Sequence, residues 1–269
     1  MGEFGWELFC WHAYVRTLSK FYDKTICVSG EHSRFLYEDF CDHYIDFTPD
    51  GGEYRDSYYK VGFDITKDLM YDLLAKSQVE PKQSKVTIFA PRRIGNPPRT
   101  HFTESFRFGH HDIVPMYKKY GMPKEKFKDF IVLHARHRLH VRPSDNWPEK
   151  NWISLVDKLK KKGYTNIVSI GLKKESMHIE GTIDLRECEQ GVLLDLLASA
   201  RCIFGPSSGA MHLASLCGCP QVVWSTDHNF DRYTKNWNPL GTRVLFLSEH
   251  GWQPTPRHVL ERFREWIYE

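Results

Sequence analysis

The sequence predicts an α/β protein made of two Rossmann-like domains that face each other across a cleft. Short apolar segments typical of buried strands alternate with helix-like segments along the whole chain. These segments form two series, which are joined by a turn-rich and lysine-rich stretch at residues 115–128. The composition, with 41% hydrophobic and 26% charged residues, is typical of a globular protein that stays in solution. We therefore expect one domain at residues 1–120 and a second at residues 121–269.

The first series contains both helices and strands. In chain order we expect a helix at residues 8–18, strands at 25–29 and 43–47, a helix near 64–76 and a strand at 85–90. A long loop follows at residues 91–111, with three prolines among its first eight residues. Loops of this length are uncommon inside compact domains, and those that occur are often functional.

The second series alternates more regularly than the first. In chain order we expect a strand at residues 130–136, a helix at 149–162, strands at 166–170 and 182–186, a helix at 190–199, a strand at 202–205, a helix that ends at Gly218, strands at 221–224 and 243–247, and a helix at 256–269. This last helix carries Val259, Phe263 and Trp266 on one stripe. We expect its apolar stripe to cross back to the first domain.

Residues 205–218, GPSSGAMHLASLCG, form a junction between a strand and a helix that suits an anion. Ser207 or Ser208 can cap the helix, and Gly209 lets a ligand approach the backbone closely. A helix that starts at the carboxyl end of a parallel strand presents free N–H groups and the positive end of its dipole. The site either binds a phosphate or is an ordinary capped helix of an α/β sheet.

Positive charge is concentrated in one segment of the chain. Residues 91–142 hold seven Arg and five Lys against four acidic residues, and six of the fourteen histidines. A solvated face accounts for part of this excess, but its density favours a polyanionic ligand such as a nucleoside diphosphate or a nucleic acid.

The chain shows no sign of membrane insertion or secretion. No apolar run approaches the ~20 residues of a membrane span, and the first residues lack the pattern of a secretory signal. The seven cysteines are an odd number with scattered spacing, which predicts free thiols in a reducing compartment. We therefore expect a cytoplasmic protein without a transmembrane segment.

Residues 205–224, GPSSGAMHLASLCGCPQVVW, resemble the nucleotide-sugar-binding segment of the heptosyltransferase-like glycosyltransferases. In that family the pattern runs Gly-Pro-(Asp/Ser)-Ser-Gly-x-x-His-Leu-Ala, followed by Gly-x-Pro and a strand. The preceding DLLASARCIF is similar to the helix and strand before this motif, and FGWELFCWHAYVRTL is similar to the first loop and helix of the family. The resemblance covers most of residues 126–225 and residues 4–20.

The resemblance implies a GT-B architecture, in which the carboxyl-terminal domain binds a nucleotide-sugar and the other domain binds an acceptor. It also implies an inverting transfer that needs no bound metal. The chain departs from the family in three ways. Ser207 stands where the family often has Asp, 269 residues is short for this class, and the strand before the first loop is missing. We expect either residues upstream of Met1 or the loss of one sheet edge.

Displacement of a nucleoside diphosphate requires a base on the attacking hydroxyl and positive charge on the departing phosphates. The resemblance places Glu7 at the position of the general base, in the loop before the first helix, with Glu3 as its competitor. Arg136 ends the first strand of the second domain, so we expect it to face the cleft and fork a phosphate. Arg138 and Arg142 follow in the same loop.

The donor is expected to bind the start of the helix described above. The predicted donor contacts of that turn are Ser207, Ser208, Gly209, Ala210, Met211 and His212. His212 either donates to a phosphate or ribose oxygen or is a packing residue. Asp184 and Glu187 either bind the nucleoside or are surface acids. Because the chain has no Asp-x-Asp pair, we expect neither a metal ligand set nor a cofactor other than the nucleotide-sugar.

The acceptor contacts are expected in the loop at residues 91–111, from Arg99, His101, Phe102 and Arg107. Cationic and aromatic side chains in alternation suit an anionic glycan, and they also suit a hydroxymethylated pyrimidine flipped out of DNA. A saccharide acceptor is the first prediction and DNA the alternative. A sugar-nucleotide epimerase and a non-catalytic sugar-nucleotide-binding module are further alternatives. The oligomeric state is left open by the sequence.

Overall fold

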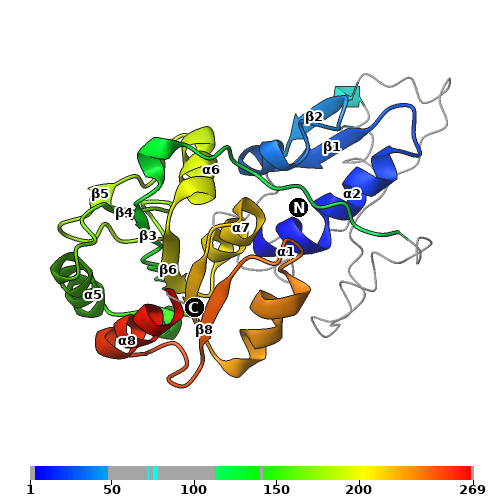
Figure 1. The fold of residues 1–269 in the computed structure, drawn as a ribbon. Coiled ribbons are helices and arrows are strands. Elements are labelled where there is room, and N and C mark those ends of the chain that lie inside the picture. Colours follow the sequence, from blue (N-terminus) through cyan, green and yellow to red (C-terminus); the bar gives the residue numbers. More distant parts are fainter. Residues whose placement is uncertain (1–3, 48–71, 73–74, 78–112, 140–141, 268–269) are drawn as a thin grey trace. The chain divides into compact units, whose positions relative to one another are not determined.

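The computed structural model describes residues 4–47, 72, 75–77, 113–139 and 142–267. The chain divides into two compact units, unit 1 at residues 1–116 and unit 2 at residues 117–269 (Figure 1). The strand predicted at residues 85–90, the loop at 91–111 and most of the helix near 64–76 lie outside the described residues. No helix within the described ranges is long and apolar enough to cross a membrane.

Unit 1 begins with two short helices and continues with two parallel strands. The described elements are α1 (Phe4–Cys10), α2 (His12–Ser19), β1 (Ile26–Ser29), the 3-10 helix η1 (Glu31–Leu36) and β2 (His43–Asp46). Strands β1 and β2 pair in register, with Cys27 opposite Tyr44. Both predicted strands of this region are therefore confirmed.

The single helix predicted at residues 8–18 is wrong, because the chain forms two helices that break at Trp11. Trp11 has φ −131° and ψ −69°, which are not helical angles. At this break the ring Nδ1 of His12 forms a hydrogen bond of 3.2 Å with the carbonyl oxygen of Glu7. A side chain thus contacts the carbonyl that a continuous helix would pair with a backbone N–H.

Unit 2 contains a six-stranded parallel sheet with the order β5-β4-β3-β6-β7-β8. Its strands are β3 (Ile131–Leu133), β4 (Ile167–Ser169), β5 (Ile183–Asp184), β6 (Cys202–Pro206), β7 (Gln221–Trp224) and β8 (Val244–Leu247). Counted from β3, this is the 3-2-1-4-5-6 order of Rossmann folds. The strands predicted in the second series are all present, shorter by a few residues in several cases.

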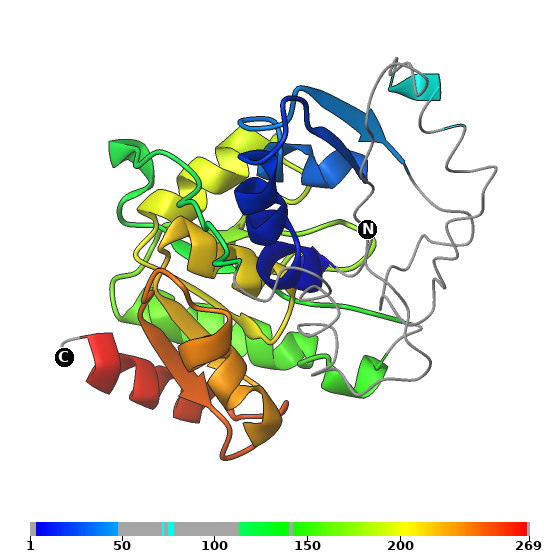
Figure 2. The ribbon, with the colours of Figure 1, turned by 90° about the vertical axis from the view of Figure 1, so that its right-hand side faces the viewer.

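Helices cover both faces of this sheet (Figure 2). They are α5 (Glu149–Lys161), α6 (Gln190–Ser199), α7 (Gly209–Cys217) and α8 (Pro256–Ile267). Helices α5 and α8 pack against each other on one face, and α6 and α7 pack together on the other. Gly218 ends α7 in the left-handed conformation, with φ 76°, as the predicted stop requires.

The main core of unit 2 lies between the sheet and the pair α5 and α8. Alternate residues of the strands enter it, because successive side chains of a strand point to opposite faces. Three fully buried tryptophans, Trp147, Trp152 and Trp224, pack there with ring centroids 4.8–5.3 Å apart. Such aromatic contacts add to the stabilisation that burial provides.

The carboxyl-terminal helix α8 is amphipathic, as predicted, but its crossing to the first domain is not confirmed. Its stripe residues Val259 and Phe263 are fully buried in the core of unit 2. The helix packs on α5 and β8, and Trp266 lies partly buried at the edge of the same cluster. Its apolar face is therefore used within unit 2.

Candidate functional site

The strand order defines where a ligand of unit 2 is expected. Strands β3 and β6 are neighbours, but the chain leaves β3 toward α5 on one face and leaves β6 toward α7 on the other. Open α/β sheets bind ligands beyond the carboxyl ends of the strands at such a switch point. The residues that directly follow β3 and β6 are therefore the first candidates.

Helix α7 begins at this switch point with unpaired backbone N–H groups. Its N-cap residue Ser208 is extended, with φ −164° and ψ 169°, yet its side chain makes no capping hydrogen bond. The first backbone bond of the helix runs from His212 N–H to the Ser208 carbonyl, at 3.1 Å. Within the described part of the chain, the N–H groups of Gly209, Ala210 and Met211 have no hydrogen-bond acceptor. These three donors and the positive end of the helix suit an anion.

The hydroxyl of Ser208 contacts His134, the residue that follows β3. Ser208 Oγ lies 2.9 Å from His134 Nδ1. The backbone N–H of Ser208 donates to the Tyr233 hydroxyl at 3.1 Å, and that hydroxyl donates to Ser207 Oγ at 3.0 Å. The two predicted serines therefore lie close together, but each side chain already has a hydrogen-bond partner, His134 for Ser208 and Tyr233 for Ser207.

Burial lowers the pKa of His134 to about 3, and the nearby guanidinium groups of Arg138 and Arg136 lower it further. The residue is only 9% exposed. It is therefore neutral at physiological pH, because both desolvation and nearby positive charge disfavour the imidazolium.

His212, the histidine of the predicted motif, packs between aromatic rings. The residue is 3% exposed, and its ring stacks on Tyr233 at 4.5 Å between centroids and meets the edge of Trp237 at 4.7 Å. Burial and the neighbouring Arg232 hold its pKa well below the ordinary value. These contacts are those of a neutral packing histidine, and its contact with a donor phosphate stays a prediction.

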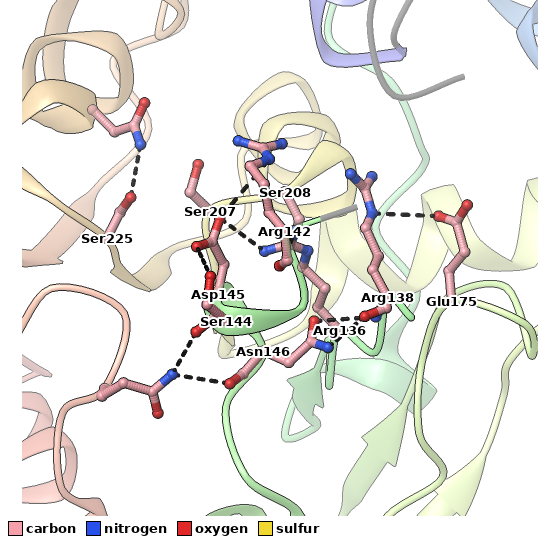
Figure 3. A network of polar contacts seen from close by, with 12 residues as sticks. Arg136, Arg138, Arg142, Ser144, Asp145, Asn146, Glu175, Ser207, Ser208 and Ser225 are labelled. Carbon is pink, nitrogen blue, oxygen red and sulfur yellow. Dashed lines mark hydrogen bonds and ion pairs between the residues drawn. The ribbon is translucent and has the colours of Figure 1, made fainter. Parts of the chain in front are cut away.

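Three arginines follow β3 in the loop that faces the same turn (Figure 3). Arg136 is buried, with Nη1 3.6 Å from Asp145 Oδ2 and its guanidinium 5.7 Å from the Trp252 ring centroid. Arg138 Nε lies 3.8 Å from Glu175 Oε2. Arg142 is the most exposed of the three, with 48% of its side chain accessible, and its Nε lies 3.9 Å from Asp145 Oδ2. Because it is exposed, Arg142 is the most accessible of these arginines to a ligand.

Asp184 and Glu187 lie at the end of β5, where each contacts a cation. Arg186 binds both carboxylate oxygens of Asp184 at 2.8 Å, which lowers the pKa of that carboxyl well below its usual range. Lys173 Nζ lies 3.7 Å from Glu187 Oε2, and the backbone N–H of Lys173 donates to Glu187 Oε1 at 3.1 Å. Their contact with the nucleoside remains a prediction.

Glu7, the predicted base, lies in helix α1 and not in a loop as expected. The residue is 1% exposed, and its carboxylate accepts hydrogen bonds from Ser29 Oγ at 2.5 Å, Ser33 Oγ at 2.7 Å and Tyr37 OH at 2.7 Å. We call these four residues the Glu7 cage. Burial and the neighbouring carboxylate raise the pKa of the Tyr37 phenol, so it stays a donor. The catalytic role of Glu7 is untested by this geometry.

The predicted acceptor residues Arg99, His101, Phe102 and Arg107 lie outside the described residues, as does Glu3. Among the residues that are described, no three His, Cys, Asp or Glu side chains are grouped so as to hold a metal ion.

Sequence reasoning missed three residues that organise this site, namely His134, Asp145 and Tyr233. His134 had a detectable signal, since it directly follows the apolar run of β3 at the sheet edge where ligands bind. Tyr233 had none, because it lies in a short π-helix (Arg232–Asn236) that the apolar pattern does not indicate.

Solved structures of the same fold are found among glycosyltransferases. The whole chain is similar to a glycosyl transferase of family 9 from Veillonella parvula, with TM-score 0.59, 12% identity and 95% of that chain covered. It is also similar over its whole length to E. coli ADP-heptose LPS heptosyltransferase II, with TM-score 0.61, 15% identity and 97% coverage.

A third similar structure is the dodecameric iron-containing heptosyltransferase TibC from enterotoxigenic E. coli, solved in complex with ADP-D-beta-D-heptose. The TM-score is 0.50 at 14% identity, over 91% of this chain and 61% of that one. The sequence matches no protein-family model and no curated protein. These likenesses confirm the predicted fold, an α/β fold with parallel sheets of the kind that GT-B heptosyltransferases have.

Proposed function

We propose that this protein is a glycosyltransferase that moves a sugar from a nucleotide-sugar donor to an acceptor hydroxyl. The observation that carries the proposal is at the start of α7. Three backbone N–H groups there have no acceptor within the described part of the chain, and they lie at the switch point of a Rossmann sheet. The fold supports it, because proteins of this fold include heptosyltransferases, one of them solved with ADP-heptose.

The donor diphosphate would bind the N–H groups of Gly209, Ala210 and Met211. A helix start offers both hydrogen-bond donors and a positive dipole end to such an anion. Arg142 would supply an exposed positive charge beside them. Its backbone has φ 48°, a left-handed conformation that L-residues rarely adopt, and backbone strain of this kind gathers at functional sites. Arg136 and Arg138 would add to the positive potential.

The transfer would invert the sugar carbon. The acceptor oxygen attacks the anomeric carbon from the face opposite the diphosphate and forms the new C–O bond. The old C–O bond breaks, and its electron pair stays on the diphosphate, whose charge the helix start and Arg142 stabilise. A carboxylate takes the hydroxyl proton. Glu7 is the first candidate for that role and Glu3 the second. Because three hydroxyls enclose the Glu7 carboxylate, the cage would have to open before Glu7 could take this proton.

The first experiment measures thermal stabilisation of the full chain by UDP, GDP, ADP, CMP and their sugars. It is run with EDTA and then with Mg²⁺, because we expect donor binding to be independent of metal. A shift by one nucleotide in EDTA supports the donor site. Absence of a shift with every nucleotide contradicts it. Acceptors, saccharides first and hydroxymethylated DNA second, are then screened for transfer, which also separates this enzyme from an epimerase or a binding module.

Gly209→Pro tests the helix start directly. Proline removes the N–H of the first helical residue but suits that position, and Ser208 before it is already extended. We expect about 10–100-fold weaker nucleotide binding by calorimetry, because one charge-assisted hydrogen bond is lost. Stability should change by less than about 0.5 kcal/mol.

Two control variants accompany this change. Gly209→Ala adds a side chain but keeps the N–H, so it separates the loss of the N–H from the effect of an added side chain and should bind nucleotide more tightly than Gly209→Pro. Glu149→Pro makes the same backbone change at the first residue of α5 and should leave binding unaltered. Equal binding by Gly209→Pro and Gly209→Ala would contradict the proposed contact.

A further inference from the structure

Ser208 stands where a serine usually caps a helix, yet it does not cap α7. An N-cap serine normally accepts a hydrogen bond from the second or third backbone N–H of its helix. Here the backbone of Ser208 has the extended conformation of an N-cap, but its hydroxyl lies 2.9 Å from His134 Nδ1 and makes no capping bond. A capping serine would occupy an N–H group that the proposed donor site needs.

We infer that His134 is a positioning residue, which holds the Ser208 hydroxyl away from the start of α7 and so keeps the first-turn N–H groups open for a phosphate. The inference rests on the proposed function and names a residue that does not itself touch the donor. His134 and Ser208 come from the two strands on either side of the switch point, and their hydrogen bond spans 74 residues of sequence.

The surroundings of His134 fix its ring in the position that this role requires. His134 is 9% exposed, and its Cδ2 packs against Gly171, where an added Cβ would lie 3.1 Å from that atom. Gly171 has φ 120°, so the backbone there also favours glycine. Because the ring is neutral, its contact with Ser208 adds no positive charge of its own to the site.

The test is a rescue experiment on nucleotide binding. His134→Phe keeps a ring in the buried position but removes Nδ1, so Ser208 becomes able to turn back and cap α7. We expect the nucleotide that stabilises the wild type to bind about tenfold more weakly to this variant. The double variant His134→Phe with Ser208→Ala has no hydroxyl to compete but keeps the backbone of residue 208, so it should bind nucleotide at least about threefold more tightly than His134→Phe alone.

Rescue by a second change separates positioning from general damage to the fold. A double variant that binds as weakly as His134→Phe would overturn the inference, and so would wild-type binding by His134→Phe alone. His134→Asn places an amide atom close to the position of Nδ1, and it should retain wild-type binding.

A second readout needs no nucleotide. Hydrogen exchange of the Ala210 and Met211 amides, followed by NMR, should slow in His134→Phe and return to the wild-type rate in the double variant. Unchanged exchange in His134→Phe would overturn the inference even if binding falls. If the wild type binds no nucleotide but the exchange pattern appears, the positioning of Ser208 holds and the proposed donor function fails.

Discussion

The Glu7 cage in unit 1 and the start of α7 in unit 2 differ in whether their polar groups have hydrogen-bond partners. In the cage, three hydroxyls enclose one carboxylate, and Glu7 is 1% exposed. At the start of α7, three backbone N–H groups lack an acceptor within the described part of the chain, and the serine that would supply one contacts His134. Groups satisfied by the chain itself stabilise the fold, whereas groups left open are available to a ligand.

The largest effect on stability is expected from a substitution that removes the carboxylate of the Glu7 cage. Glu7→Ala leaves the hydroxyls of Ser29, Ser33 and Tyr37 buried without their acceptor and opens a cavity. We expect a loss of about 3–5 kcal/mol in the free energy of unfolding, because each buried polar group then pays its desolvation cost. Urea denaturation of the full chain measures it.

Two further variants are needed, one as a control for stability and one to separate a structural from a catalytic role of Glu7. Glu38→Ala changes an exposed glutamate of the same unit and should cost less than about 0.5 kcal/mol. Glu7→Gln keeps one acceptor oxygen and much of the packing. If it folds, binds nucleotide and has lost transfer, Glu7 has a catalytic role beyond the cage. A cost below about 1 kcal/mol for Glu7→Ala would contradict the structural role of the cage.

The second effect is pH-dependent and has the same cause in both units, one buried histidine in unit 1 and two in unit 2 among the described residues. Burial lowers the pKa of His12 in unit 1 to about 4, and it lowers the pKa of His134 and His212 in unit 2. Below the ordinary value of 6.5 the unfolded chain binds protons that these folded rings do not bind. Stability therefore falls as the pH drops through 6.5, by about 2 kcal/mol per histidine between pH 7 and pH 5.

His212→Phe sharpens this prediction, since phenylalanine keeps the stacking on Tyr233 but cannot titrate. We expect unfolding measured at pH 7, 6 and 5 to lose about 2 kcal/mol less in this variant than in the wild type. The exposed His228→Phe is the control and should keep the wild-type pH dependence. An unaltered pH dependence in His212→Phe would mean that His212 binds its proton over the same pH range in the folded and the unfolded chain.

The elements of unit 2 could be predicted because their signals are local. QVVW at β7 is a continuous apolar run, as a strand buried on both faces requires, and Gly218 ends α7 in a conformation that favours glycine. The break at Trp11 could not be predicted, because it accompanies contacts of Glu7 with residues 22 to 30 positions away. The contact between His134 and Ser208 depends in the same way on strand order, which no local pattern encodes.

The smallest expected effect concerns a polar group that is satisfied but exposed. Arg186 holds both oxygens of Asp184 at the surface end of β5. Asp184→Asn should change the free energy of unfolding by less than about 1 kcal/mol, because water replaces the contacts that are lost. Asp184 is therefore an intermediate case. Like Glu7 it has a hydrogen-bond partner within the chain, but because it is exposed, that contact orients the carboxylate and stabilises the fold only slightly. Nucleotide affinity of the same variant tests its predicted role toward the nucleoside. Weaker binding at unchanged stability would assign Asp184 to the donor, whereas unchanged binding would leave it a surface acid whose partner is Arg186.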